Sequence, residues 1–260
     1  MEIRALAKEE RFQNTVIGIL IEAGKLINAT KQKHFSLTQK GKGDFVTSID
    51  KEVERFLVKH LKEILPQAGF IAEENEYEKA GNANWIIDPI DGTGNFLSGL
   101  DYSISVALQY DKETLLGVVY VPLDELIYMG IATVGAFKIK DERRLEKLKV
   151  IEFQDDEGIV FFGLPYNREK TNKIFSIAEK IYPITSDIKR IGPASVDICR
   201  VAEGIGKLYF ELDLKIWDIA AGELILKEAG GEMHIMDDLY LFGSRNTIQR
   251  AKEKIGFAHN

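Results

Sequence analysis

Apolar residues at helical spacing predict two amphipathic helices in the first quarter of the chain. The first stripe recurs at steps of three and four residues between positions 12 and 27, which places its members on one helix face. The second stripe runs from 53 to 65 and stops before Pro66, and Thr47 with Asp50 resembles a capping box at its start. A layer of helices is therefore expected before the first sheet.

Beyond position 70 the spacing shortens and strands are predicted. Runs rich in β-branched and aromatic residues lie at 85–87, 102–109, 115–121, 126–129, 136–139 and 159–162. Later segments alternate between extended spacing and helical spacing, the extended ones at 184–191 and 208–211 and the helical ones at 171–181, 195–202 and 218–229. The alternation predicts an α/β protein of layered α+β type, an αβαβα five-layer sandwich.

No repeat, low-complexity tract or flexible linker divides the chain. We therefore expect residues 1–260 to form a single compact unit. Within it, an N-terminal α+β lobe at 1–148 and a C-terminal α/β lobe at 149–260 should be rigidly joined. The charged run at 138–149 mixes both signs, so we interpret it as a solvated face.

The chain is acidic and carries one cysteine. Its 34 Lys and Arg residues against 41 Asp and Glu residues give a formal net charge of −7, which disfavours binding to a nucleic-acid backbone. No apolar run approaches the roughly 18 residues of a membrane helix, and the N-terminus lacks a signal-peptide core, so we expect a cytoplasmic protein that does not bind membranes. Cys199 alone cannot form an internal disulfide or a multi-thiolate metal site.

The most informative motif is the acidic segment from Trp85 to Phe96, where an apolar strand leads into a loop with two carboxylates and two glycines. We expect Asp88 to end the strand, Pro89 to prevent the ladder from continuing, and Asp91 to sit at a turn. Both carboxylates can then converge on a cation. Oxygen ligands without histidine or cysteine favour Mg²⁺ or Mn²⁺ over zinc, and the glycines let backbone amides approach a phosphate.

An ordinary β-turn is the alternative interpretation of this motif, because Asp, Pro and Gly are common turn residues. Other acidic residues at the edges of apolar elements weaken that alternative. They are Asp44, Asp50, Glu73, Glu74 and Asp218. Carboxylates at such edges are what a shared metal centre would use, although spacing alone does not show that they meet.

Taken together, these segments resemble the inositol monophosphatase family over almost the whole chain. The similar segments are 43–50, Glu73-Glu74, 85–96, 217–222 and 228–231. The resemblance implies a Mg²⁺-dependent, often lithium-sensitive phosphomonoesterase with the layered sandwich fold, usually a homodimer.

The resemblance also implies a role for individual residues. The catalytic residues would be Asp50, Glu73 and Thr93, with Asp50 and Thr93 orienting and deprotonating water. The metal ligands would be Glu73, Asp88, the carbonyl of Ile90, Asp91 and Asp218. The substrate-binding residues would be Asp91, Gly92, Thr93, Ala194, Glu211 and Asp218. Lys40 matches a basic loop that closes over the site. Two interpretations of Arg190 stay open, the exposed end of a surface strand and a contact to a further phosphate, and Arg168 is a second candidate for such a contact.

The expected function is Mg²⁺-dependent hydrolysis of phosphate monoesters of inositol or sugars by direct attack of activated water, with Mn²⁺ as a substitute. Inositol 1-phosphate and fructose 1,6-bisphosphate are the candidate substrates. Two alternatives remain open at this point: a 3′-phosphoadenosine 5′-phosphate phosphatase, and a non-catalytic regulatory protein that keeps the fold. The expected partner is a small phosphate monoester, together with a second copy of the chain in a homodimer.

Overall fold

The structure is a computed structural model that describes residues 2–31, 37–41, 44–79, 81–140 and 143–256, with side chains omitted at 30–47 and 143–145. Its largest element is a seven-stranded sheet in the strand order β3-β4-β5-β6-β7-β8-β9. The strands are β3 (Gly69–Ala72), β4 (Ala83–Asp91), β5 (Ser103–Tyr110), β6 (Glu113–Val121), β7 (Leu126–Ile131), β8 (Gly135–Lys140) and β9 (Arg143–Lys147).

A five-stranded sheet and a short hairpin complete the β-structure. The second sheet has the order β11-β10-β12-β14-β13, in which β10 runs parallel to β11 and β12. Its strands are β10 (Ile159–Phe162), β11 (Asp187–Lys189), β12 (Gly206–Leu212), β13 (Glu232–Met236) and β14 (Leu239–Gly243). The hairpin pairs β1 (Leu37–Gly41) with β2 (Asp44–Thr47).

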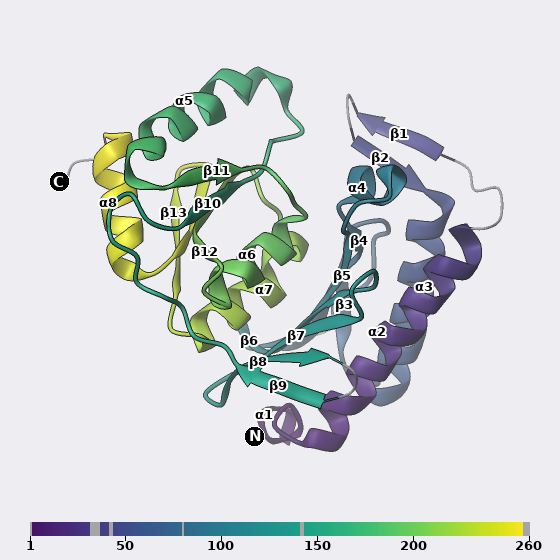
Figure 1. Cartoon of the computed structure of the whole chain (residues 1–260). Coiled ribbons are helices and arrows are strands. Elements are labelled where there is room, and N and C mark those ends of the chain that lie inside the picture. The colour runs from purple at the N-terminus through teal and green to yellow at the C-terminus, as the bar shows by residue number, and fades with distance from the viewer. Residues whose placement is uncertain (1, 32–36, 42–43, 80, 141–142, 257–260) are drawn as a thin grey trace.

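Helices cover both sheets and fill the space between them (Figure 1). They are α1 (Glu2–Leu6), α2 (Glu10–Lys31), α3 (Ser48–Ile64), α4 (Thr93–Ser98), α5 (Thr171–Ile181), α6 (Ala194–Ala202), α7 (Ile216–Glu228) and α8 (Arg245–Ile255), with 3₁₀ turns η1 (Arg168–Lys170) and η2 (Tyr182–Ile184). Helices α2 and α3 form the outer layer on the first sheet, α6 and α7 the central layer, and α5 and α8 the outer layer on the second sheet. The predicted five-layer αβαβα architecture is confirmed.

Three hydrophobic cores lie between the five layers, and side-chain alternation along the strands builds them. On β5, Val106 faces the core under α2 and α3, whereas its neighbour Ala107 faces the central helices. On β12, Tyr209 faces the central helices and Phe210 faces α5 and α8. Because both faces of each sheet are covered, the strands are apolar on both sides, which gives the short apolar runs in the sequence.

The central helix α7 lies unusually close to the first sheet. A Cβ added at Gly117 of β6 would come within 2.8 Å of the carbonyl oxygen of Ala221, and one added at Gly130 of β7 would come within 2.9 Å of the backbone of Ile225. Glycine at these two positions therefore permits the close approach of the helix. The approach fixes α7, and with it the N-terminal turn that carries Asp218, against the sheet that carries the acidic motif.

Two expectations from the sequence are corrected by the strand pairing. Strand β4 does not end at Asp88: it continues through Pro89 to Asp91, with a register shift against β5 between Asp88 and Asp91. An irregularity of this kind accommodates a proline that cannot donate to the ladder. The charged run at 138–149 is also more than a solvated face, because it contains the end of β8 and the edge strand β9.

The periodic elements agree with the structure within a few residues. The stripe at 12–27 lies in α2, the segment at 171–181 is α5, and the segment at 195–202 lies in α6. The segment at 184–191, predicted to be extended throughout, contains only the short strand β11 after the turn η2. No helix within the described ranges is long and apolar enough to cross a membrane.

A fully buried lysine joins the second sheet to the segment that precedes it. The Lys207 side chain on β12 is 1% exposed. Its Nζ donates to the carbonyl oxygens of Gln154 at 2.7 Å, Glu157 at 3.3 Å and Ile184 at 2.6 Å. These three bonds satisfy a charge that would otherwise be costly to bury, and they fix the segments that lead into β10 and β11.

Replacing this lysine should therefore destabilise the fold. Lys207→Met keeps the length of the side chain but leaves three carbonyls without their donor, so we expect the free energy of unfolding to fall by about 3 kcal/mol. Urea denaturation of the variant would measure the loss. Lys254→Met, on the exposed face of α8, should stay within about 0.5 kcal/mol of the parent protein. Equal stability of the two variants would show that the carbonyl contacts contribute little.

Candidate active site

The acidic motif lies at the end of β4, where the irregular pairing turns its carboxylates toward the space between the two sheets. Asp88 and Asp91 are 2% and 8% exposed. The Asp88 Oδ1 accepts a bond from the backbone N–H of Ile90 at 3.1 Å. Gly92 then adopts a φ of +86° and begins α4, and a Cβ there would lie 2.9 Å from the ring of Pro193. Only glycine fits this turn without strain.

Thr93, the first residue of α4, is bonded to Asp50. The Thr93 hydroxyl lies 3.1 Å from Asp50 Oδ1 and 3.3 Å from the carbonyl oxygen of Ile90. Asp50 is fully buried in the first turn of α3. The predicted pair is therefore in contact, with the hydroxyl as donor and the carboxylate as acceptor.

Glu73 lies on the segment that follows β3, and a buried glutamate of α3 holds that segment. Glu54 is 0% exposed, and its two carboxylate oxygens accept bonds from the backbone N–H of Glu74 at 2.8 Å and from Asn75 Nδ2 at 2.6 Å. These contacts place Glu73 at the same end of the first sheet as the acidic motif. Glu54 was not singled out in the sequence, where it looks like one more charge on a helix.

Asp218 comes from the first turn of α7. Its Oδ2 accepts a bond from the backbone N–H of Lys215 at 2.6 Å, the reciprocal half of an N-terminal cap. A carboxylate at this position is favoured by the positive end of the helix. The capping bond thus orients Asp218 toward the pocket.

These side chains line one pocket of about 550 Å³ between the two sheets. The first sheet, α4 and the first turn of α7 contribute Glu73, Asp88, Ile90, Asp91, Gly92, Thr93, Trp217 and Asp218. The second sheet and its loops contribute Pro165, Tyr166, Asn167, Glu211, Leu212, Asp213, Leu214 and Lys215. We call the first set the acidic half of the pocket and the second set the polar half.

Negative charge in the acidic half is concentrated, with Asp88 and Asp91 buried and Glu73 and Asp218 partly exposed. Burial, followed by repulsion from Glu73, Asp91 and Asp218, raises the pKa of Asp88 well above its ordinary value. Burial also raises the pKa of Asp218, again with repulsion from Asp91. Burial raises the pKa of Asp91 to about 6, against the opposing effect of hydrogen bonds from Ser195. Such a group of carboxylates favours a bound cation or proton.

The oxygen atoms that line the acidic half are of the chemical type that binds a hard divalent cation. The lining contains carboxylates and a backbone carbonyl but neither histidine nor cysteine, which is the ligand chemistry of Mg²⁺ or Mn²⁺. Within the described ranges, however, no three acidic, histidine or cysteine side chains stand close enough together to form a ready-made metal cage. The carboxylates surround the same pocket rather than a single point, so the ligand assignment stays a prediction.

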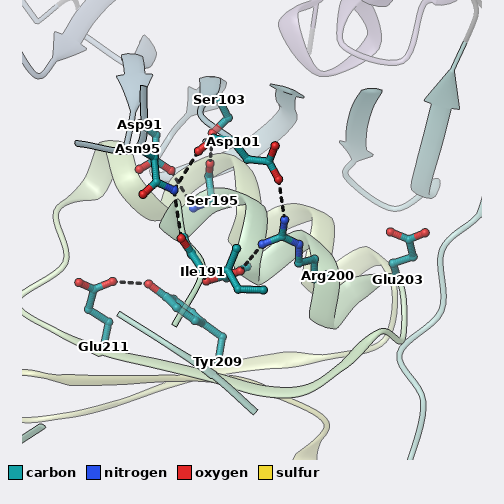
Figure 2. A network of polar contacts seen from close by, with 12 residues as sticks. Asp91, Asn95, Asp101, Ser103, Ile191, Ser195, Arg200, Glu203, Tyr209 and Glu211 are labelled. Atoms are coloured by element: carbon teal, nitrogen blue, oxygen red, sulfur yellow. Dashed lines mark hydrogen bonds and ion pairs between the residues drawn. The ribbon is translucent and has the colours of Figure 1, made fainter. Parts of the chain in front are cut away.

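A hydrogen-bond network holds Asp91 against the N-terminus of α6 (Figure 2). The backbone N–H of Ser195 donates to Asp91 Oδ2 at 2.8 Å, and the buried hydroxyls of Ser195 and Ser103 lie 2.7 Å apart. Asn95 Nδ2 donates to the carbonyls of Asp101 at 2.9 Å and Ile191 at 3.0 Å. The network joins the acidic loop of the first sheet to the central helix layer.

The segment before α6 is fixed by a second part of this network. The backbone N–H of Gly192 donates to Asp197 Oδ2 at 2.9 Å. Arg200 donates to Asp197 Oδ1 at 2.6 Å and to Asp101 Oδ2 at 3.1 Å. Because Asp197 is fully buried, its pairing with Arg200 stabilises both the helix start and the loop that faces Asp91.

Glu211 supplies a further, partly buried carboxylate near the end of β12 in the polar half. It accepts a short hydrogen bond from the hydroxyl of Tyr209 (Figure 2). Burial raises the pKa of Glu211 to about 7, although the bond from Tyr209 opposes the shift. Its side chain lies directly over Gly163, where a Cβ would come within 1.9 Å of Oε2. Glu211 is therefore fixed in place and can accept a hydrogen bond from a substrate hydroxyl.

The other residues predicted for the site lie around the pocket with different contacts. The Ala194 amide faces Asp91 and does not line the pocket. Arg190 and Arg168 are exposed and lie outside the lining, although Arg190 is near enough to Glu211 to lower its pKa. The side chain of Lys40 is outside the described residues. The loop role of Lys40 and the phosphate contacts of Arg190 and Arg168 stay predictions.

Several residues in or beside the pocket were not predicted. Asn95 and Ser195 lie beside it and act through contacts that span 96 and 104 positions, for which the sequence gives no local signal. Asn167 and Tyr166 line the pocket, but no pattern distinguishes them in the sequence. The tyrosine is 65% exposed, and a large exposed aromatic residue beside a cleft is recognised only in the folded chain.

The fold and the pocket define a two-sheet α/β protein with a buried acidic cleft. A family model described as the inositol monophosphatase family matches residues 8–255. The chain is 35% identical over 225 residues to the Nus factor SuhB of Haemophilus influenzae, covering 84% of this chain and 82% of that protein. It is 33% identical to the fructose-1,6-bisphosphatase/inositol-1-monophosphatase of Aquifex aeolicus, covering 78% of this chain and 77% of that one.

A solved structure agrees with these relatives. The extragenic suppressor protein suhB from Bartonella henselae superposes with a TM-score of 0.87 at 25% identity, covering 96% of this chain and 100% of that one. The chain therefore belongs to the inositol monophosphatase family, a family of phosphatases. The resemblance inferred from the acidic segments is confirmed.

The buried carboxylates should make the metal-free protein sensitive to pH. The pKa of Asp91 is raised from 3.8 to about 6, so the folded state binds its proton more tightly than the unfolded chain does. The contribution of this proton to the stability of the folded state is fully present below about pH 4 and is lost as the pH rises through 6. Thermal melts from pH 4 to 7 in a chelator should therefore show wild type losing stability relative to Asp91→Asn as the pH rises. A difference independent of pH would contradict the burial of an ionisable Asp91.

Proposed function

We propose that the protein hydrolyses phosphate monoesters of polyhydroxylated alcohols, such as inositol or sugar phosphates, with Mg²⁺ bound in the acidic half of the pocket. The observation that carries this proposal is the hydrogen bond between Thr93 and Asp50 beside the buried carboxylates of one pocket. An acidic site repels a phosphate unless cations reverse the local field. The pocket therefore combines two features that hydrolysis of a phosphate ester requires: places for cations and a proton acceptor.

The residues that would hold the metal are Glu73, Asp88, Asp91, Asp218 and the carbonyl of Ile90. When bound, Mg²⁺ supplies positive charge that lowers the pKa of water and neutralises the phosphate. Mn²⁺ prefers the same oxygen donors and would be a substitute. The small, φ-positive Gly92 leaves the backbone beside Thr93 open to the phosphate oxygens.

The proton is handled by Thr93 and Asp50. Because the Thr93 hydroxyl donates to Asp50, its oxygen keeps a lone pair that can accept a hydrogen bond from the attacking water. Thr93 thereby orients the water and can relay its proton to the buried carboxylate. Water attacks phosphorus directly and the configuration inverts. The cysteine does not compete as a nucleophile, because Cys199 is fully buried and burial raises the pKa of its thiol.

The polar half of the pocket is suited to the alcohol part of the substrate. Glu211 and Asp213 present acceptors for hydroxyl groups, and Asn167 presents both a donor and an acceptor. A ligand with several hydroxyls can satisfy these groups, whereas an apolar alcohol would leave them unpaired at a cost in affinity. Inositol 1-phosphate and fructose 1,6-bisphosphate both fit this description.

A role without catalysis is the competing proposal, since the Haemophilus influenzae relative is named a Nus factor. A purely structural role would not require Thr93 bonded to a buried Asp50, or several carboxylates of raised pKa around one pocket, and such groups are costly to keep. We therefore propose phosphatase activity. A 3′-phosphoadenosine 5′-phosphate phosphatase is less well supported, because Gly94-Asn95-Phe96 stands where such enzymes carry lysine and glutamate after Asp-Gly-Thr.

Phosphate release should depend on the metal and on its proposed ligands. With inositol 1-phosphate, fructose 1,6-bisphosphate and 3′-phosphoadenosine 5′-phosphate, we expect turnover of the first two in Mg²⁺ and none in a chelator. Asp218→Asn should lower kcat by at least about a hundredfold while the thermal melt is retained. Turnover in a chelator would contradict the metal proposal, and no turnover of any of the three esters would contradict the phosphatase.

The Thr93–Asp50 pair should act as one unit. Thr93→Val and Asp50→Asn are close in shape to the parent residues, and each should lower kcat by roughly a hundred- to ten-thousandfold. The double variant should be about as slow as the worse single variant, because either change interrupts the same proton relay. Ser98→Ala, at the exposed end of the same short helix, is the matched control and should keep full activity. If the fold-loss of kcat in the double variant equals the product of the two single losses, the two residues act separately.

A further inference from the structure

A charged cluster outside the acidic half joins the two walls of the polar half. Lys170 Nζ lies 2.6 Å from Asp213 Oδ1 and 2.6 Å from Asp238 Oδ2. Lys173, one turn further along, pairs with Asp238 as well but not with Asp213. The cluster brings together η1, the segment after β12 and the turn between β13 and β14. One lysine thus connects three segments that are separate in the sequence.

Two of these segments form the walls of the polar half. The wall 165–167 comes directly before η1 and Lys170, and the wall 213–215 begins at Asp213. Lys170 itself is not among the residues that line the pocket. Asp213 does line it, so the ion pair ties the wall 213–215 to the segment that directly follows the wall 165–167 and fixes one wall relative to the other.

The backbone at Asp213 depends on its surroundings. Its φ is +64°, in the left-handed region that is uncommon for residues other than glycine and tolerated by aspartate. The backbone N–H of Asp213 donates to the carbonyl of Asp238 at 2.9 Å, while the carboxylate binds Lys170. Both contacts hold the start of the wall 213–215, just after Glu211, in a conformation that costs energy by itself.

We propose that Lys170 is a positioning residue that sets the spacing of the two walls and thereby determines how well the alcohol part of the substrate is bound. This inference rests on the proposed phosphatase function. Lys170 does not touch the phosphate or the metal site. The walls bind the alcohol part of the substrate equally well in the ground state and in the transition state. Loss of the Lys170 side chain should weaken both interactions by the same amount, which raises KM and leaves kcat unchanged.

The cluster has the properties of a local rather than a global constraint. The Lys170 and Asp213 side chains are 28% and 33% exposed, so water and salt screen their attraction. Their pairing contributes little to the unfolding equilibrium of the whole chain. A change in substrate recognition without a change in melting temperature is what distinguishes positioning of the walls from support of the fold.

Steady-state kinetics of Lys170→Met with two substrates would test the proposal. For inositol 1-phosphate, we expect KM to rise roughly five- to tenfold at unchanged kcat. For p-nitrophenyl phosphate, whose planar ring has no hydroxyls for the walls to bind, KM should stay within about twofold. Lys170→Arg should restore KM for inositol 1-phosphate, because it can pair with both aspartates. Lys173→Met is the matched control: it removes an ion pair to Asp238 but leaves Asp213 bound, and should match wild type.

Three results would overturn the inference: unchanged KM in Lys170→Met, a fall in kcat with both substrates, or an equal effect of Lys173→Met. Failure of the phosphatase proposal would look different, since wild type itself would then release no phosphate from either ester. In that case the dissociation constant of inositol 1-phosphate in Mg²⁺, measured by calorimetry, replaces KM. It must be raised in Lys170→Met and close to the wild-type value in Lys170→Arg and Lys173→Met. Absence of wild-type binding as well would overturn both proposals.

Discussion

Burial of negative charge between two sheets is the constraint on which the rest of the structure depends. Asp88, Asp91 and Asp218 come from a strand and a helix that would repel one another at this point if nothing opposed their charges. Backbone amides supply part of the opposition: Ser195 donates to Asp91 and Lys215 donates to Asp218. Both donors lie at helix N-termini, where the positive end of the helix adds to the effect. The central helix layer is therefore part of the site as well as part of the core.

Local periodicity predicted the helices because an amphipathic stripe is recorded within the segment itself. Helices α2 and α5 were found in this way, and so was the order of layers. The path of β4 through Pro89 was not, since it depends on irregular pairing with β5. Strand β9 was missed for a related reason: an edge strand rich in Lys, Arg and Glu has the composition of solvated surface, and only its pairing with β8 identifies it.

The same distinction holds for the site. The acidic residues that line the pocket could be found because turn chemistry and strand ends mark them in the sequence, and the folded chain brings Thr93 and Asp50 into contact. Contacts that join distant segments had no such marker. Asn95 reaches Ile191 across 96 positions, and Lys170 reaches Asp238 across 68. In the sequence Lys170 is one of many lysines, and only the folded chain pairs it with Asp213.

The two halves of the pocket can change independently, because different sheets carry them. The acidic half is built on β4 and α7, which are fixed by buried glycine contacts and by the α6 network, so the core sets the path of its backbone. The polar half is built on segments after β10 and β12, held by half-exposed ion pairs that contribute little to stability. Substitution in the polar half therefore reshapes the pocket at small structural cost. Under the proposed phosphatase function, such a substitution would change which alcohol fits while the acidic half stays the same, and one relative at 33% identity carries a name that joins two phosphatase activities.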